Sequence, residues 1–309
     1  MARPGAGAGA TAFVIVPVPP ASAVAFVDAR HGWVGTAGGL LGTTDGRTFR
    51  VEVRAPIIGI SAFDRARAWA ITGDGLVLRT SDGHRWSRLG APHLVGVQFV
   101  DAGVGFGLTR DGVLVRSTDS GATWQRARAP GLVQSECFST RRDGWTARGG
   151  AVWTTHDGGR GWTRTRLRTG SQEAPSLGCD ERDAWVVFAE GAAAGTEGYH
   201  VYRSLDGGPW GAVLASPFQR KLPSISNYAG PFTVLGHGAA VFTGSCAPCG
   251  GRGTATIVRT RDGGATFARA TWPGPAPTAV DFLDTRRGWI VAGRRVWRTL
   301  DGGAHWRRP

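Results

Sequence analysis

Apolar residues occur along the chain in short groups separated by turn residues, without the spacing of an amphipathic helix. The stretch 59–89 shows the pattern clearly, and Asp74-Gly75 supplies a tight hairpin turn at its centre. Four strands are predicted in this stretch, at residues 59–64, 68–72, 76–80 and 86–89. The pattern therefore predicts an all-β protein built from four-stranded antiparallel units.

One turn sequence, called the box below, repeats along the chain. It consists of Ser or Thr, any residue, Asp, then Gly or Ser, with an aromatic residue four or five positions after the Asp. Its seven aspartates are Asp45, Asp82, Asp119, Asp157, Asp206, Asp262 and Asp301. They are 37, 37, 38, 49, 56 and 39 residues apart, so the two long intervals predict insertions, at residues 189–199, 215–231 and 245–256. Repeats of this length with four strands each are typical of β-propeller blades.

A second motif precedes the boxes: an aromatic residue that follows Gly or Ala. It occurs at Trp33, Trp69, Phe106, Trp145, Trp185 and Trp289. In five units an Asp lies five residues before the aromatic: Asp28, Asp64, Asp101, Asp180 and Asp284. Residues 25–33 align with 281–289 without a gap, so the first and last units are predicted to be blades of one ring.

The box aspartates are interpreted as turn fasteners. A carboxylate at this place accepts hydrogen bonds from backbone N–H groups of the turn, and the Ser or Thr hydroxyl bonds the backbone in the same way. The glycines that follow supply positive φ, and the aromatic ring packs beneath the turn. An enzyme does not need the same catalytic residue seven times in a regular repeat. The box aspartates are therefore predicted to stabilise the fold.

These boxes resemble the Asp-box, or bacterial neuraminidase repeat, of sialidases, sortilin-type receptors and several glycoside hydrolases. With seven units and an aromatic residue after Gly or Ala before six of the boxes, the chain from about residue 12 onward resembles the photosystem II stability and assembly factor family. The resemblance implies a seven-bladed β-propeller without known enzymatic activity that acts as an assembly or interaction factor. It also favours an extracytoplasmic location.

The domain prediction is a disordered segment at residues 1–11 and a single propeller at 12–309. After Trp306 only three residues remain, too few for the outer strand of the last blade, so residues 12–18 are expected to pair there and close the ring. The competing interpretation is a signal peptide cleaved after Ala21-Ser22-Ala23. Both cannot hold for the same residues, and the pattern favours closure.

Composition adds a strong positive charge. The 309 residues carry a net charge of +13, from 36 basic and 23 acidic side chains, and Lys221 is the only lysine. Such a surface attracts an acidic protein or acidic polymer, while nucleic acid is disfavoured because no known binding module accompanies the charge. No apolar run approaches the roughly 18 residues of a membrane helix, and a monomer is expected.

Candidate catalytic groups are few. Glu136 and Glu173 could face a central channel, and a sialidase-like glycoside hydrolase is the first alternative to a binding scaffold. Only three tyrosines exist, and the N-terminal Arg-Ile-Pro motif of sialidases is absent. We therefore predict a non-enzymatic scaffold with no cofactor, no metal and no catalytic residues, with a basic polyanion-binding module as the second alternative.

The four cysteines fall into two pairs. Cys246 and Cys249 lie in the Gly-rich insertion of the sixth unit, where a short disulfide is expected if the protein is exported. Cys137 and Cys179 are placed on the inner strands of neighbouring units, where a bridge and two buried thiols remain equally open. The spacing of cysteines and histidines offers no zinc site.

Overall fold

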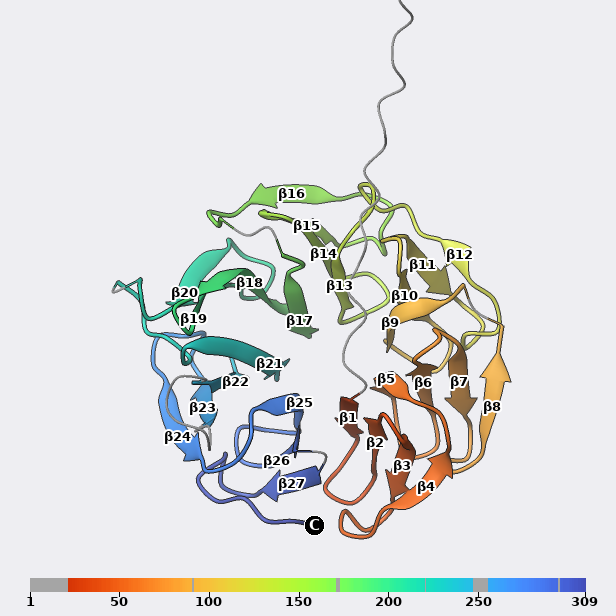
Figure 1. Cartoon of the computed structure of the whole chain (residues 1–309). Helices are drawn as coiled ribbons and strands as arrows, with labels where there is room; N and C mark the ends of the chain where they lie inside the picture. The colour runs from red at the N-terminus through yellow and green to blue at the C-terminus, as the bar shows by residue number, and fades with distance from the viewer. Residues whose placement is uncertain (1–21, 91, 171–172, 220, 247–254, 294) are drawn as a thin grey trace, which may run out of the picture.

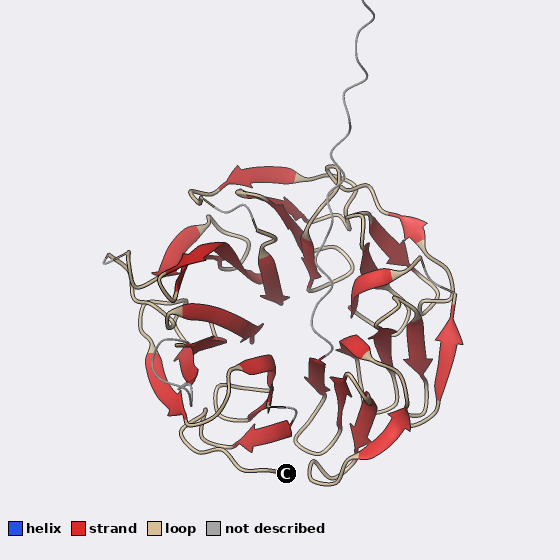
Figure 2. Cartoon of the chain, viewed as in Figure 1, coloured by secondary structure: helices blue, strands red, loops and turns tan. Residues whose placement is uncertain are grey.

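The short apolar segments form strands that are grouped into seven sheets arranged in a ring (Figure 1), and the inner strands line a central channel. The structure is a computed structural model, and it describes residues 22–90, 92–170, 173–219, 221–246, 255–293 and 295–309. Figure 2 shows strands and loops, and no helix occurs in these residues. The predicted all-β, seven-bladed propeller is confirmed.

Each sheet is one blade, numbered in chain order. Blades 1 to 3 contain β1 (Ser22–Phe26), β2 (Gly32–Thr36), β3 (Gly39–Thr43), β4 (Arg50–Val53), β5 (Ile57–Ala62), β6 (Ala68–Thr72), β7 (Val77–Thr80), β8 (Trp86–Leu89), β9 (Leu94–Phe99), β10 (Gly105–Thr109), β11 (Leu114–Ser117) and β12 (Gln125–Arg126). Blades 4 and 5 contain β13 (Ser135–Phe138), β14 (Gly144–Arg148), β15 (Ala151–Thr155), β16 (Thr163–Arg166), β17 (Ser176–Asp180), β18 (Asp183–Ala193), β19 (Thr196–Ser204) and β20 (Gly211–Ala215). Blades 6 and 7 contain β21 (Tyr228–Val234), β22 (Ala240–Ser245), β23 (Ala255–Thr260), β24 (Ala268–Trp272), β25 (Pro277–Phe282), β26 (Gly288–Ala292) and β27 (Arg295–Thr299).

Every blade is an antiparallel meander, with its first strand beside the channel and its last at the rim (Figure 1). Because the strands alternate in direction, turns after the first and third strands lie on one face of the ring. That face carries the boxes and is called the box face. The hairpins after the second strands and the connections between blades lie on the opposite side, called the hairpin face.

Blade 7 has three strands, β25, β26 and β27. Next to β27, Arg307 forms an isolated antiparallel bridge with Arg298, with N···O distances of 2.8 and 2.9 Å in the two directions. Arg307 follows the box aromatic directly, as the fourth strand does in blade 1. Residues 12–18, predicted to supply an outer strand here, lie outside the described residues, so ring closure through them stays a prediction.

Packing between blades explains the Gly-aromatic motif. In blade 4 the ring of Phe138 lies so close to Gly144 that a Cβ there would be 2.2 Å from it, and Gly32, Gly105 and Gly288 are covered in the same way. The phenylalanine is also stacked on the motif aromatic of the preceding blade, with ring centroids 3.5 Å apart for Phe106 and Phe138. The motif glycine is therefore required for close contact between ring and backbone.

The inner strands are also joined to each other across the blade boundaries. In each case a polar side chain on one inner strand accepts a hydrogen bond from a backbone N–H on the next one. The pairs are Ser61 with Phe99 (2.8 Å), Gln98 with Phe138 (2.8 Å), Ser135 with Leu177 (3.1 Å) and Asp281 with Phe26 (2.6 Å). These bonds satisfy backbone donors that would otherwise face the channel unpaired.

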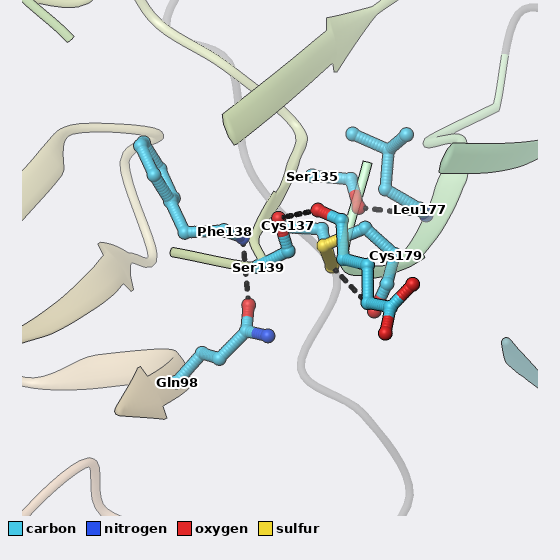
Figure 3. Close-up of a disulfide and its surroundings, with 8 residues drawn as sticks. Gln98, Ser135, Cys137, Phe138, Ser139, Leu177 and Cys179 are labelled. Atoms are coloured by element: carbon cyan, nitrogen blue, oxygen red, sulfur yellow. Dashed lines mark hydrogen bonds between the residues drawn. A yellow bond between two sulfur atoms is a disulfide. The ribbon is translucent and has the colours of Figure 1, made fainter. Parts of the chain in front are cut away.

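A disulfide joins blades 4 and 5. Cys137 on β13 and Cys179 on β17 are bridged, with Cα atoms 5.9 Å apart (Figure 3). The close-up shows the bridge beside the inter-blade bonds of Ser135 with Leu177 and of Gln98 with Phe138. Of the two possibilities left open by the sequence, the structure selects the bridge. The other predicted disulfide, between Cys246 and Cys249, is not tested, because Cys249 lies outside the described residues.

Candidate functional site

Six of the seven box aspartates form the same hydrogen-bonded turn. In blade 3, Asp119 accepts hydrogen bonds from the Ser117 hydroxyl (2.8 Å), from the Thr123 backbone N–H (2.9 Å) and from the Thr123 hydroxyl (2.6 Å). These bonds, led by the Thr123 hydroxyl, lower the pKa of Asp119 to about 2. The equivalent carboxylates at Asp45, Asp82, Asp157, Asp262 and Asp301 accept the same kind of backbone bond. Carboxylates engaged in this way are poorly suited to catalysis.

The fifth box differs. The Asp206 side chain is 82% exposed and lies 3.1 Å from Arg182. Its turn contains Pro209, which has no N–H to donate at the position that serves the other boxes. The buried Asp183 accepts hydrogen bonds from the N–H groups of Asp206 (2.9 Å) and Gly238 (2.6 Å). In other boxes the N–H of the aspartate bonds the Ser or Thr hydroxyl instead, as in Asp119 with Ser117. Proline in the box was the sequence signal for this change.

The difference between these two boxes gives a direct test of the stabilising role. Replacing Asp119 with alanine is expected to lower the melting temperature, because three donors of the turn lose their acceptor. The matched change Asp206→Ala is expected to leave it nearly unchanged. Calorimetric melting of both variants checks this, and equal losses in the two would contradict the assigned role of the box carboxylate.

The central channel is a cavity of about 820 Å³. Its walls are formed by the inner strands of all seven blades (Figure 1). Two carboxylates line it, Glu136 on β13 and Asp281 on β25, and none of the described lining residues is basic. The channel of this strongly basic protein is therefore locally acidic.

Burial raises the pKa of both channel carboxylates. Burial raises the pKa of Glu136 from 4.5 to about 8, and its carboxylate lies against Gly96 of the neighbouring blade. Burial also raises the pKa of Asp281 to about 6, although the hydrogen bond from the Phe26 N–H acts in the opposite direction. Desolvation disfavours the ionised form, because a carboxylate loses more hydration than a neutral carboxyl group.

A pH dependence follows from Glu136. Its pKa is higher in the folded protein, so its contribution to stability is fully present below about pH 4.5 and is lost as the pH rises to about 8. The variant Glu136→Gln cannot ionise at this position. As the pH rises through this range, the melting temperature of the variant should therefore increase relative to that of the wild type. Asp281 titrates in both proteins and cancels in the comparison. A difference that does not vary with pH would contradict the raised pKa.

The two glutamates considered as hydrolase residues are not placed alike. Glu136 lines the channel, whereas Glu173 is exposed in the connection between β16 and β17 and is absent from the described channel lining. Asp281 is the other described channel carboxylate, and no role was predicted for it from the sequence. The described residues contain no group of three or more His, Cys, Asp and Glu that could hold a metal ion.

The insertions of blades 5 and 6 meet on the hairpin face. Strands β18 and β19 extend well beyond the other hairpins, and their end is bonded to the segment before β21. The Glu197 N–H donates to Asn227 O (2.9 Å), the Asn227 amide donates to Thr196 Oγ1 (2.7 Å), and Glu197 Oε2 accepts from the Ala229 N–H (3.1 Å). We call residues 190–197, 216–219 and 221–229 the insertion surface. Most of the third insertion, 245–256, lies outside the described residues.

The insertion surface carries an exposed aromatic ring. Phe218 is 65% exposed, the most of the large apolar side chains classed as exposed in the described residues. Val51, on β4 of the distant blade 1, is 52% exposed and provides a comparison. The described part of the chain contains no helix long and apolar enough to span a membrane.

The fold and its turns define a seven-bladed β-propeller with repeated Asp-containing turns. A scan against protein-family models found no match, and a search of curated proteins also found none. Solved structures do match. YCF48 from Cyanidioschyzon merolae aligns with a TM-score of 0.64 at 19% identity, over 93% of this chain and 98% of that one. YCF48 bound to D1 peptide aligns with a TM-score of 0.62 at 18% identity, over 93% and 95%.

An enzyme is also structurally similar. The GH74 xyloglucanase from Xanthomonas campestris gives a TM-score of 0.67 at 14% identity, over 94% of this chain and 53% of that one. The similarity to YCF48 agrees with the predicted resemblance to the photosystem II stability and assembly factors. At these identities the comparisons show the fold.

Proposed function

We propose that this protein is a non-enzymatic scaffold that binds another protein, as a monomer, through its insertion surface. The observation that carries the proposal is the joined insertion of blades 5 and 6, with Phe218 exposed on it. The rest of the ring is a regular repeat whose box carboxylates, apart from Asp206, are hydrogen-bonded by their own turns. When a scaffold is otherwise uniform, added loops are where recognition is expected.

The structural neighbours support the same proposal. YCF48 is a propeller of matching length, and one of its structures holds a bound peptide. The disulfide between Cys137 and Cys179 supports an extracytoplasmic location, because such bonds persist in oxidising compartments. A net charge of +13 favours an acidic partner surface.

The test is affinity capture followed by binding measurements with the purified partner. Three baits are compared: the wild type, Phe218→Ser on the insertion surface, and Val51→Ser as a matched loss of an exposed apolar side chain. We expect the first and third baits to bind one protein equally, and Phe218→Ser to bind it about tenfold more weakly. Equal binding by all three would exclude the insertion surface as the docking site.

A glycoside hydrolase is the second candidate, favoured by the raised pKa of Glu136 and by the GH74 neighbour. A general acid needs such a pKa, together with a second carboxylate about 5 to 9.5 Å away. Asp281 is available in the channel, but its carboxylate is engaged by the Phe26 N–H. Release of reducing sugar from xyloglucan, lost in Glu136→Gln and retained in Glu173→Gln, would establish this activity and overturn the scaffold proposal.

A further inference from the structure

Five boxes are preceded directly by an arginine, called the pre-box arginine: Arg79, Arg116, Arg203, Arg259 and Arg298. In blades 5 and 6 this residue fastens its blade to the next one. Arg203 Nε donates to Gly263 O (2.9 Å), and Arg259 Nη1 donates to Asp301 O (3.1 Å), so both bond the following box. At these two boundaries the arginine has a structural role.

Arg116 and Arg298 are bonded differently. In both, Nε is buried and has no hydrogen-bond partner in the described structure. Each guanidinium group lies over an aromatic ring of its own blade, 5.7 Å from the Phe106 centroid and 5.8 Å from the Trp289 centroid. A buried donor of a charged group is costly to leave unpaired, so these two arginines lack the acceptor that their counterparts have.

Arg116 opens into a pocket of about 300 Å³ between blades 3 and 4, which we call the 3/4 pocket. It is lined by the box of blade 4 and by the outer strand of blade 3, where Gln125 pairs directly with Arg116. Its charged lining is Arg116, Arg126, Arg128 and Arg160, and no described lining residue is Asp or Glu.

Three of the four arginines of this pocket have no carboxylate partner in the part of the chain that the structure describes. The fourth, Arg160, lies near Asp157: the pKa of Asp157 is lowered by hydrogen bonds from Gly161 and Thr155 and, to a smaller extent, by the charge of Arg160. Asp119, the box carboxylate of blade 3, is bonded by its own turn. Within the described residues, no ion pair joins Arg116, Arg126 or Arg128 to a carboxylate.

The boundary between blades 1 and 2 shows what can fill such a position. There Gly42 replaces the pre-box arginine, and the protein's own Glu52 occupies the space: a Cβ on Gly42 would lie 2.0 Å from Glu52 Oε1. Glu52 Oε2 accepts a hydrogen bond from Trp86 Nε1 at 2.7 Å. Counted from the box aromatic, Ala127 corresponds to Glu52: it follows Trp124 by three residues, as Glu52 follows Phe49. Ala127 lines the 3/4 pocket, so this pocket lacks the internal carboxylate.

The boundary between blades 7 and 1 repeats the arrangement. Its pocket of about 420 Å³ is lined by Arg298, Arg47, Arg307 and Arg308, together with the carboxylate of Asp301. Burial lowers the pKa of Arg298, and the charges of Arg47 and Arg287 add to the effect. Because this pocket contains a carboxylate of its own, the 3/4 pocket is the stronger anion site.

We propose that the 3/4 pocket binds a tetrahedral oxyanion, phosphate or sulfate, held by Arg116, Arg126 and Arg128. Planar guanidinium groups match the oxygens of such ions with paired, charge-assisted hydrogen bonds. The anion neutralises the positive charge of the cluster. The site lies on the outer part of the box face, away from the insertion surface, and needs no protein partner.

Titration calorimetry on the full chain tests the proposal, with inorganic phosphate and inorganic sulfate at ionic strength held constant with chloride. The variants Arg116→Gln and Arg126→Gln are expected to weaken binding about tenfold each. Arg166→Gln, an exposed arginine on β16, makes the same change of charge elsewhere and should bind as the wild type does. Arg126 is exposed, so its variant is informative even where Arg116→Gln folds poorly.

A fourth variant, Ala127→Glu, places a carboxylate where blade 1 has one and is expected to abolish binding while the fold is retained. Glycerol 3-phosphate, titrated in parallel, decides the source of the anion: equal binding assigns a phosphate ester, and binding of inorganic ions alone assigns the free ion. The proposal is overturned if phosphate and sulfate give no signal beyond chloride. It is also overturned if Arg126→Gln and Ala127→Glu bind like the wild type.

Discussion

Replacing Trp289 with alanine is expected to reduce the free energy of unfolding by about 3 to 5 kcal/mol, the usual cost of removing a buried aromatic side chain. Trp289 is 0% exposed and is stacked on Phe26, with ring centroids 3.7 Å apart. This contact joins blade 7 to blade 1, where the ring closes. The Trp289 Nε1 has no hydrogen-bond partner in the described structure, so the loss comes from packing.

The matched control is Trp289→Phe. Blade 3 already has phenylalanine at this position, where Phe106 stacks on Phe138 at 3.5 Å. A smaller ring should therefore be tolerated, with a much smaller loss than in the alanine variant. Urea unfolding of both variants measures the difference. Similar stability of Trp289→Ala and the wild type would show that the closing contact contributes little.

Removing the disulfide in the double variant Cys137→Ser/Cys179→Ser is expected to cost about 4 kcal/mol, the loop-closure entropy for a bridge of this span. The two cysteines are 42 residues apart in sequence, so the bridge strongly restricts the unfolded chain. In the folded state it adds a covalent link to the hydrogen bond between Ser135 and Leu177.

Reduction of the wild type provides the control. The melting temperature of the wild type should fall in the presence of a reductant to nearly that of the double variant, which itself should not respond. Thiol titration confirms that the bond has been reduced. An unchanged melting temperature of the fully reduced wild type would show that the bridge does not stabilise the ring.

Much of the fold could be predicted because its signals are local and repeated. The box places Ser or Thr, Asp and Gly within a few residues, so a single turn can be inferred seven times from its own chemistry. Asp206 shows the limit: Pro209 removes one donor, and Asp183, 23 residues earlier on β18, accepts the Asp206 N–H. The spacing within the box cannot reveal an acceptor that comes from another strand of the blade.

The channel and the bridge depend on how blades lie beside each other, which no single repeat encodes. Glu136 and Asp281 belong to different blades, and each faces the channel because of the orientation of its strand. The bond between Cys137 and Cys179 likewise depends on the distance between two sheets. The pre-box arginines were visible as a repeat, but their different partners at each blade boundary were not.

The disulfide has a consequence for the continuity of the chain. Cys137 precedes, and Cys179 follows, the backbone connection between β16 and β17, so the bridge spans the only backbone link between blades 4 and 5. A protease cut within that connection would leave two fragments covalently attached, and they would separate on a denaturing gel only after reduction. The same connection is a natural position for new termini in a circularly permuted protein, because the bridge would preserve the junction that the permutation opens.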